Sequence, residues 1–183
     1  KGPKKKLPYI EMDGQKIGDS DIIIQALAAK FGIDPEAGLT ASQKTESFFI
    51  RKALEESFYY IVMYGRWIEP RGWNDTKRLF FGKLPIPLRF IVPKIVLPTI
   101  KKQLHYQGMG RHSAEEVERR GVDFIEHLST LLGEQSYVFG KKPSLIDCVV
   151  FPFLYNASLL PPTNMMAIAC QRHPQIGAYL QRM

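Results

Sequence analysis

One predicted β-hairpin near the N-terminus constrains the fold of this chain more than any other feature. Residues 7–12 have the pattern of a short strand, Asp13-Gly14 is a strong hairpin turn signal, and residues 15–18 would be the returning strand. Two strands alone are only marginally stable in water, and no later segment has a strand pattern. We therefore expect the neighbouring strands upstream of Lys1, in a native chain that begins earlier.

Everything after the hairpin is predicted to be helical or to connect helices. Ser20 is expected to be the N-cap of the first helix, which ends at Gly32, and residues 33–39 would be a linker. Residues 69–74 are expected to break the chain between a long helix and a short one. Apolar residues at helical spacing predict helices over the approximate ranges 20–31, 40–68, 75–81, 113–132, 144–159, 164–170 and 174–182, and a further helix that ends near 106.

A proline-rich apolar segment spans residues 84–98. Its prolines 93 and 98 are expected to kink any helix that passes through them, because proline lacks a backbone N–H donor. We expect this segment to be buried between helices rather than to contact a membrane or a partner. No stretch reaches the roughly 18 uninterrupted apolar residues that a membrane-spanning helix needs. Association with a membrane surface is the less favoured alternative.

The composition is that of a globular protein and does not indicate a particular function. The 183 residues are 45% hydrophobic and 23% charged, which suits one large globular domain or two small ones. The formal net charge of +7 favours acidic partners, but no nucleic-acid-binding module is recognisable. Two cysteines, Cys148 and Cys170, form neither a disulfide framework nor a metal site, so we expect no metal and a reducing compartment, the cytoplasm.

The residues with the clearest chemical pattern flank the hairpin. Lys6-Leu7-Pro8 precedes the first strand, and Asp19-Ser20 follows the second at the start of a helix. A cis X-Pro bond would expose the backbone of Leu7 to a bound peptide, and a helix N-terminus favours a carboxylate. Ser20 could donate to that carboxylate, and Asp19 could accept from an ammonium group. The alternative is that Asp19-Ser20 is only a helix cap.

The run Leu-Pro-Tyr-Ile-Glu-Met-Asp-Gly-Gln-Lys-Ile-Gly-Asp-Ser, residues 7–20, resembles the second half of the N-terminal domain of glutathione transferases. The resemblance implies a cis Pro8 and glutathione contacts from Leu7, Asp19 and Ser20, with Lys6 as a further contributor. The implied fold is mostly α: the C-terminal half of a thioredoxin-like domain, 1–33, followed by an all-helical domain, 40–183. The Pro143–Asp147 stretch resembles a family capping motif, in which Ser144 and Asp147 are folding residues.

Two further stretches resemble the failed-axon-connections and metaxin-like branch of this superfamily. They are residues 64–67, with Trp73 nearby, and Gln-Gly-Met-Gly-Arg-His-Ser at 107–113. The resemblance implies glutathione as cosubstrate, a small electrophile, a homodimer and transfer or reduction chemistry of the kind used in detoxification. The thiol-activating residue is expected upstream of Lys1. The alternative, favoured by the metaxin likeness, is a non-catalytic adaptor.

In the fold that this sequence resembles, the long helix lines the cosubstrate pocket, which implies that one or two of its aromatic residues Tyr60, Tyr64 and Trp67 face that pocket. The alternative is that these aromatic residues belong to the core. Arg111 and His112, after a glycine pair, would contact an anion or the cosubstrate. The alternative is a loop packed by its own side chains, with Arg111 bound to carbonyl groups. Ser113 begins a capping box with Glu116, which explains this serine better than a hydrolytic triad does.

Overall fold

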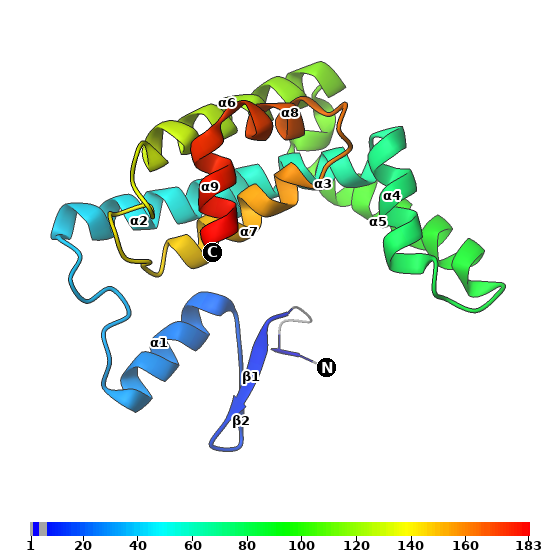
Figure 1. Cartoon of the computed structure of the whole chain (residues 1–183). Helices are drawn as coiled ribbons and strands as arrows, with labels where there is room; N and C mark the ends of the chain where they lie inside the picture. Colours follow the sequence, from blue (N-terminus) through cyan, green and yellow to red (C-terminus); the bar gives the residue numbers. More distant parts are fainter. Residues whose placement is uncertain (1, 4–6) are drawn as a thin grey trace. The chain divides into compact units, whose positions relative to one another are not determined.

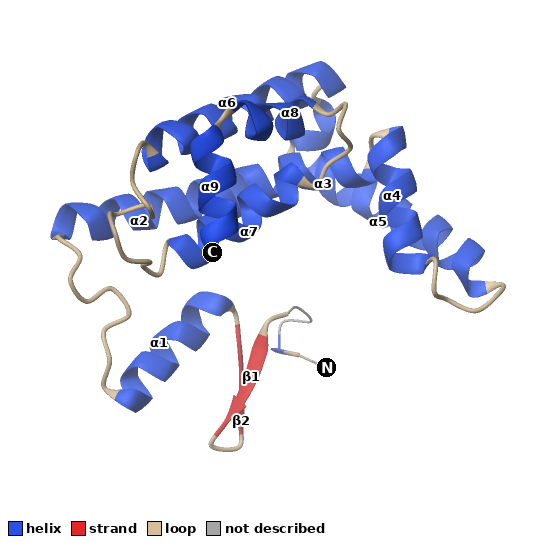
Figure 2. Cartoon of the chain, in the orientation of Figure 1, coloured by secondary structure: helices blue, strands red, loops and turns tan. Residues whose placement is uncertain are grey.

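A computed structural model describes residues 2–3 and 7–183, and it divides into two compact units, Lys1–Thr40 and Ala41–Met183. Figure 1 follows the chain from blue to red, and Figure 2 shows that the strands of the described residues lie in the first unit. The predicted fold class is confirmed, because a small antiparallel sheet is followed by a helical bundle.

The first unit contains the predicted hairpin and one helix. Strand β1 (Tyr9–Met12) pairs antiparallel with β2 (Gln15–Gly18), and helix α1 (Ser20–Phe31) follows. Asp13 and Gly14 connect the strands with φ angles of 52° and 76°. Positive φ at both central residues is typical of a two-residue hairpin turn whose twist matches the strands. The turn prediction is therefore confirmed.

Helix α1 is attached to the hairpin by one buried apolar residue and one ion pair. Ile23 is buried, and Lys30 Nζ lies 2.7 Å from an Asp13 carboxylate oxygen at the hairpin turn. The helix ends at Gly32, which has a left-handed conformation and whose N–H donates to the Ala28 carbonyl. The ion pair is exposed, so its main effect is to fix where the helix end lies rather than to add much stability.

The second unit is a bundle of helices around one core. Its elements are α2 (Ala41–Ala53), the π-helical segment η2 (Leu54–Phe58), α3 (Tyr59–Trp67), α4 (Pro70–Phe81), α5 (Leu88–Gln107), the 3₁₀ turn η3 (Met109–Arg111), α6 (Ala114–Leu132), α7 (Asp147–Ser158), α8 (Met165–Arg172) and α9 (Pro174–Arg182). Seven of these elements contribute deeply buried apolar residues to the core, among them Leu54, Phe58, Ile61, Leu104, Ile125, Val150, Leu154, Met166 and Ile176. Elements η2 and α3 supply the first three, so the long helical segment forms the centre of the bundle.

Several helix boundaries differ from the sequence prediction. Asp19, not Ser20, is the N-cap of α1, because its carboxylate accepts from the Asp21 N–H. Residues 69–74 are not a break: α4 already begins at Pro70, a position where the missing proline N–H costs no helical hydrogen bond. Helix α5 runs from Leu88 through both internal prolines without ending.

The prediction that residues 84–98 are buried between helices is wrong. On α5 only Pro93 and Leu104 are buried, although the helix has 20 residues. Ile86 is 69% exposed and Ile95 is 65% exposed. Among the described residues, no helix has both the length and the apolar content required to cross a membrane.

Cys170 gives a testable pH dependence of stability. Burial raises the pKa of this thiol from 9.0 to about 11, so the folded state favours the neutral form. As pH rises, the thiol ionises in the unfolded chain at a lower pH than in the folded chain. The stability that neutral Cys170 contributes is therefore complete below pH 9 and is lost as pH rises toward 11. We expect the unfolding free energy to fall by about 1–3 kcal/mol in this window, measured by urea denaturation. Cys170→Ala should flatten the curve, and an unchanged alkaline loss in that variant would contradict this assignment.

Candidate functional site

The hairpin register brings together the two dipeptides that the sequence singled out. Tyr9 pairs with Gly18 at the last position of the ladder, so Leu7-Pro8 and Asp19-Ser20 adjoin the same end of the hairpin in sequence. The Asp19 N–H donates to the Pro8 carbonyl at 3.3 Å, which continues the ladder beyond the strands. The Leu7–Pro8 peptide bond is cis, as the family resemblance implied. Pro8 and Asp19, eleven positions apart in sequence, thus share one end of the hairpin.

Asp19 has an unusual backbone conformation at this end of the hairpin. Its φ of 89° and ψ of 125° lie in a region that residues other than glycine rarely adopt. Such a conformation costs on the order of 1–3 kcal/mol and often marks a functional site. Asp19 also holds the start of α1, since its carboxylate accepts from the Asp21 N–H at 3.1 Å and its carbonyl from the Ile23 N–H at 2.9 Å.

Ser20 and Leu7 are accessible at the same place. Leu7 is 82% exposed, and Ser20, the first residue of α1, is also exposed. Within residues 2–3 and 7–183, the Ser20 hydroxyl has no hydrogen-bond partner, so it can donate to a ligand. The positive end of the α1 dipole lies at this residue and favours a negative group. Lys6, the further predicted contributor, lies outside the described residues.

In the second unit, Tyr64 and Arg111 each lie next to His105. Tyr64 is buried and lines a cavity of about 420 Å³ together with His105 and other residues of α5. Burial, with a smaller effect of Glu69, raises the pKa of the Tyr64 hydroxyl. The Arg111 Nε donates to the His105 carbonyl at 3.0 Å. This is the self-packed loop that was the alternative interpretation for Arg111.

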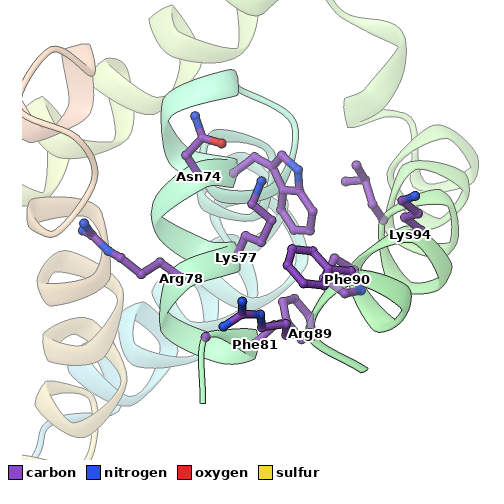
Figure 3. Close-up of a pocket in the computed structure, with 11 residues that line it drawn as sticks. Asn74, Lys77, Arg78, Phe81, Arg89, Phe90 and Lys94 are labelled. Carbon is purple, nitrogen blue, oxygen red and sulfur yellow. The ribbon is translucent and has the colours of Figure 1, made fainter. Parts of the chain in front are cut away.

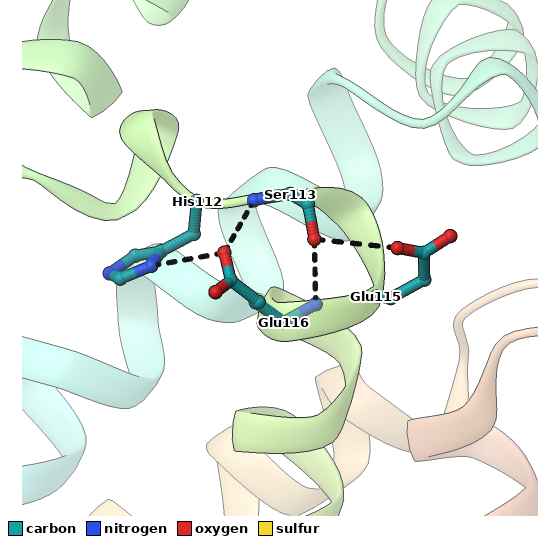
Figure 4. Close-up of polar contacts among 4 residues, drawn as sticks. All are labelled: His112, Ser113, Glu115 and Glu116. Carbon is teal, nitrogen blue, oxygen red and sulfur yellow. Dashed lines mark hydrogen bonds and ion pairs between the residues drawn. The ribbon is translucent and has the colours of Figure 1, made fainter.

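His112 belongs to the start of α6 rather than to a cavity wall. Figure 4 shows its Nδ1 beside Glu116 Oε2, at 3.4 Å. The same Glu116 oxygen accepts from the Ser113 N–H, while the Ser113 hydroxyl accepts from the Glu116 N–H. The predicted capping box is therefore confirmed. The Ser113 backbone hydrogen bond, followed by His112, lowers the pKa of Glu116.

The other two predicted pocket residues have different neighbours. Tyr60 is partly buried against the core, and its ring lies edge-on to Tyr59 at 5.1 Å. Trp67 packs against Trp73 at 5.6 Å and against Phe80 at 6.2 Å, at the junction of α3 and α4. The five residues predicted to form one cosubstrate pocket therefore do not share a cavity. They lie instead at the His105 cavity and its adjoining loop, at the α6 cap and in two aromatic contacts.

Asp147 and Ser144 form a buried polar junction in the bundle. Asp147 is completely buried, and its carboxylate accepts from the Val138 N–H at 2.9 Å and from the Ser144 N–H and hydroxyl, each at 2.8 Å. The Tyr179 hydroxyl donates to the same carboxylate at 3.2 Å. These contacts connect the loop before α7 to α9, which is a structural role.

A groove between α4 and α5 was missed by the sequence reasoning. It has a volume of about 470 Å³, and Figure 3 shows Phe81 and Phe90 between the two helices, with Lys77, Arg89 and Lys94 around them. The signal in the sequence is the alternation of basic and apolar residues from 77 to 94. Among the described residues, no group of three or more His, Cys, Asp or Glu side chains could hold a metal ion.

The hairpin, the prolyl turn opposite a helix start and the helical bundle together define a glutathione transferase-like protein. The family described as glutathione S-transferase N-terminal domain matches residues 1–72, and the one described as glutathione S-transferase C-terminal domain matches residues 122–183. No solved structure matches the chain.

Curated relatives agree with this class. The chain is similar to isoprene-epoxide glutathione S-transferase of Rhodococcus sp. (strain AD45), with 30% identity over 99% of this chain and 77% of that protein. It is 33% identical to Failed axon connections of Drosophila melanogaster over 98% of this chain and 46% of that protein, and 26% identical to human metaxin-2 over 88% and 62%. The chain therefore belongs to the glutathione S-transferase family, and it spans only about half the length of the Drosophila relative.

Proposed function

We propose that this chain binds glutathione at the end of the hairpin where Leu7-Pro8 adjoins Asp19-Ser20. The observation that carries the proposal is the hydrogen bond from the Asp19 N–H to the Pro8 carbonyl, which joins the exposed segment at Leu7 to the start of α1, where Ser20 is exposed. The family uses glutathione as cosubstrate. A tripeptide with a free α-amino acid end suits both halves of this arrangement.

Each described residue of the site has a distinct part in the proposed binding. The Leu7 backbone pairs with the cysteinyl backbone of the tripeptide, as a strand adds to a sheet edge. The Ser20 hydroxyl donates to the γ-glutamyl carboxylate, which the positive end of the α1 dipole also stabilises. The Asp19 carboxylate accepts from the ammonium group of the same γ-glutamyl end. These contacts would hold the thiol in a fixed position.

The reaction that best fits this binding mode is transfer of glutathione to an electrophile. The thiolate attacks an electrophilic carbon, a C–S bond forms, and the bond to the leaving group breaks. With an epoxide, the substrate class named for the Rhodococcus relative, the C–O bond breaks and the alkoxide takes up a proton. We assign the thiol-activating role to no residue of this chain. Glutathione-dependent reduction would use the same binding contacts.

Replacement of Ser20 tests the binding site directly. Ser20→Ala removes a hydrogen bond to a charged carboxylate, and such bonds are worth about 1.5–3 kcal/mol, so we expect glutathione affinity to fall roughly 10- to 100-fold. Isothermal titration calorimetry of the two proteins measures this change. Ser42→Ala, an exposed serine of α2, is the matched control and should bind like the wild type.

A wild-type protein that binds no glutathione would overturn the proposed site. If Ser20→Ala binds glutathione with unchanged affinity, glutathione remains the ligand but Ser20 does not contact it. Turnover is a separate question, answered with an epoxide and with a panel of other electrophiles and disulfides. Bound glutathione without turnover on any of them would leave binding in place and exclude the transferase reaction.

A second candidate is a partner-binding adaptor without transfer chemistry. The observation that favours it is the exposed apolar surface of α5, which suits an interaction rather than catalysis. This candidate predicts weak or no glutathione binding, so the same calorimetry separates it from the first. A homodimer and a cytoplasmic location are further proposals, which size-exclusion chromatography with light scattering and cell imaging would test.

A further inference from the structure

The positive charge of this protein is concentrated in one helical hairpin. Residues 70–107, which form α4, the connecting loop and α5, contain eight lysines and arginines and a single acidic residue, Asp75. This segment therefore carries a formal charge of +7, which is the net charge of the whole chain. The remaining residues are balanced. Asp75 is itself paired with Arg78 at 3.1 Å, so it does not offset the other basic groups.

The same hairpin exposes aliphatic side chains on one side of α5. Leu88, Ile91 and Ile95 follow the i, i+3, i+7 spacing that places residues on one helix face, and each is exposed. Ile86, in the loop before the helix, extends this apolar surface toward the tip of the hairpin. In Figure 1 this tip extends beyond α3 at one end of the bundle. We call these four residues the apolar stripe.

Basic residues alternate with the apolar stripe along the same hairpin. Lys83 is exposed in the loop, and Arg89 and Lys94 are exposed on α5. The Arg89 guanidinium lies 4.8 Å from the centre of the Phe90 ring, at the groove between α4 and α5 (Figure 3). A surface that combines exposed aliphatic groups with lysine and arginine matches the boundary between lipid headgroups and acyl chains.

We propose that the α4–α5 hairpin docks on an anionic lipid surface, with the apolar stripe in the acyl boundary and the flanking lysines and arginines at the phosphates. A second copy of this chain is disfavoured because two hairpins of charge +7 would repel each other. Nucleic acid would use the charge but would leave the aliphatic side chains without a partner. A lipid surface uses both features.

The two tryptophans of the chain give a readout in the unmodified protein. Trp67 and Trp73 pack against each other beside the α4–α5 groove. Vesicles of phosphatidylcholine mixed with phosphatidylserine should shift their fluorescence, and brominated acyl chains should quench it. Vesicles of phosphatidylcholine alone should do neither. Equal responses to both compositions, or no response to the anionic one, would overturn the proposal.

Charge reversal within the hairpin tests the electrostatic part. The triple variant Lys83→Glu, Arg89→Glu, Lys94→Glu should lower the partition coefficient for anionic vesicles roughly 100-fold in a sedimentation assay. The control, Lys16→Glu, Lys141→Glu, Lys142→Glu, changes the net charge equally at exposed positions elsewhere and should lower it only a few-fold. Equal losses in both variants would show that bulk charge alone drives binding and would overturn the docking site.

Removal of the apolar stripe tests the other part at constant charge. Ile86→Ser, Ile91→Ser, Ile95→Ser should lower anionic-vesicle binding at least roughly tenfold. These side chains are exposed, so circular dichroism should show an unchanged fold. Unchanged vesicle binding would overturn the role of the stripe. If the wild type self-associates and this variant does not, the occupant is a second copy instead. Glutathione affinity should not change in either variant.

Discussion

Replacing Asp147 by alanine is expected to lower the free energy of unfolding by about 4 kcal/mol. The carboxylate is completely buried and accepts four hydrogen bonds, from the Val138 N–H, the Ser144 N–H and hydroxyl, and the Tyr179 hydroxyl. Alanine would leave the Val138 N–H and the Ser144 N–H and hydroxyl without this acceptor, while the Tyr179 hydroxyl would keep only the backbone carbonyl of residue 147. Each unsatisfied buried polar group costs about 1–3 kcal/mol, so the loss exceeds that of a single hydrogen bond.

The effect should be cooperative because the junction connects distant parts of the bundle. Asp147 begins α7, Ser144 lies in the loop before it, and Tyr179 belongs to α9. Burial and the neighbouring Asp147 raise the pKa of the Tyr179 hydroxyl, so it stays protonated and able to donate at neutral pH. The same O–H also lies 3.2 Å from the Asp147 carbonyl oxygen, so its one proton is shared between the carboxylate and the carbonyl.

Urea denaturation of a double-mutant cycle measures this coupling. Tyr179→Phe alone should cost about 1 kcal/mol, because it removes one donor and keeps the ring. The double variant Asp147→Ala, Tyr179→Phe should then be less destabilised than the sum of the two single variants. Additive losses, or a loss below about 1.5 kcal/mol for Asp147→Ala, would mean that water or a rearranged loop satisfies the donors.

Local chemistry explains which features the sequence predicts well. The hairpin was predictable because Asp13-Gly14 is a two-residue turn signal, and both residues have the positive φ that this turn needs. The α6 cap was predictable because Ser113 and Glu116 satisfy each other within one turn of helix. Neither feature depends on a distant part of the chain.

Long-range pairing explains the error at the start of α1. Ser20 has the residue type of an N-cap, but the hairpin ladder ends with the Asp19 N–H bound to the Pro8 carbonyl. That bond holds Asp19 outside the helix with φ of 89°, so Asp19 becomes the cap and Ser20 the first helical residue. The same hydrogen bond holds the Leu7-Pro8 and Asp19-Ser20 dipeptides at one end of the hairpin. The two dipeptides are neighbours because of how the hairpin pairs. Helix propensity, which depends only on local sequence, does not predict this proximity.

Side-chain exposure is a second property that a local sequence pattern does not predict. The apolar residues of 84–98 were expected to be buried because aliphatic side chains usually are. In the described part of the chain, Ile86 and Ile95 are largely exposed. The residues predicted to line one cosubstrate pocket are separated for a similar reason. Trp67, for example, packs against Trp73 across the α3–α4 junction. Only the positions of whole helices decide such contacts.

The α3–α4 junction also gives the second large expected effect. A Cβ atom added at Gly72 would lie 1.9 Å from the Gly65 carbonyl oxygen, a backbone atom that cannot rotate away. The two helices cross so closely that the Thr76 hydroxyl donates to the Arg66 carbonyl at 3.0 Å. Gly72→Ala must therefore separate α4 from α3, and we expect a loss of roughly 3 kcal/mol or more.

Thermal and urea unfolding of Gly72→Ala should be compared with Gly177→Ala. Gly177 lies in α9 with no atom within 4 Å of an added Cβ, so its replacement has only the helix propensity effect, a gain of up to about 1 kcal/mol. Two identical substitutions, both within helices, should thus change stability in opposite directions. Because α4 forms one side of the proposed docking hairpin, Gly72→Ala should also weaken vesicle binding, whereas Gly177→Ala should not. Equal stability of the two variants would show that α4 can shift freely and that the close crossing is not required.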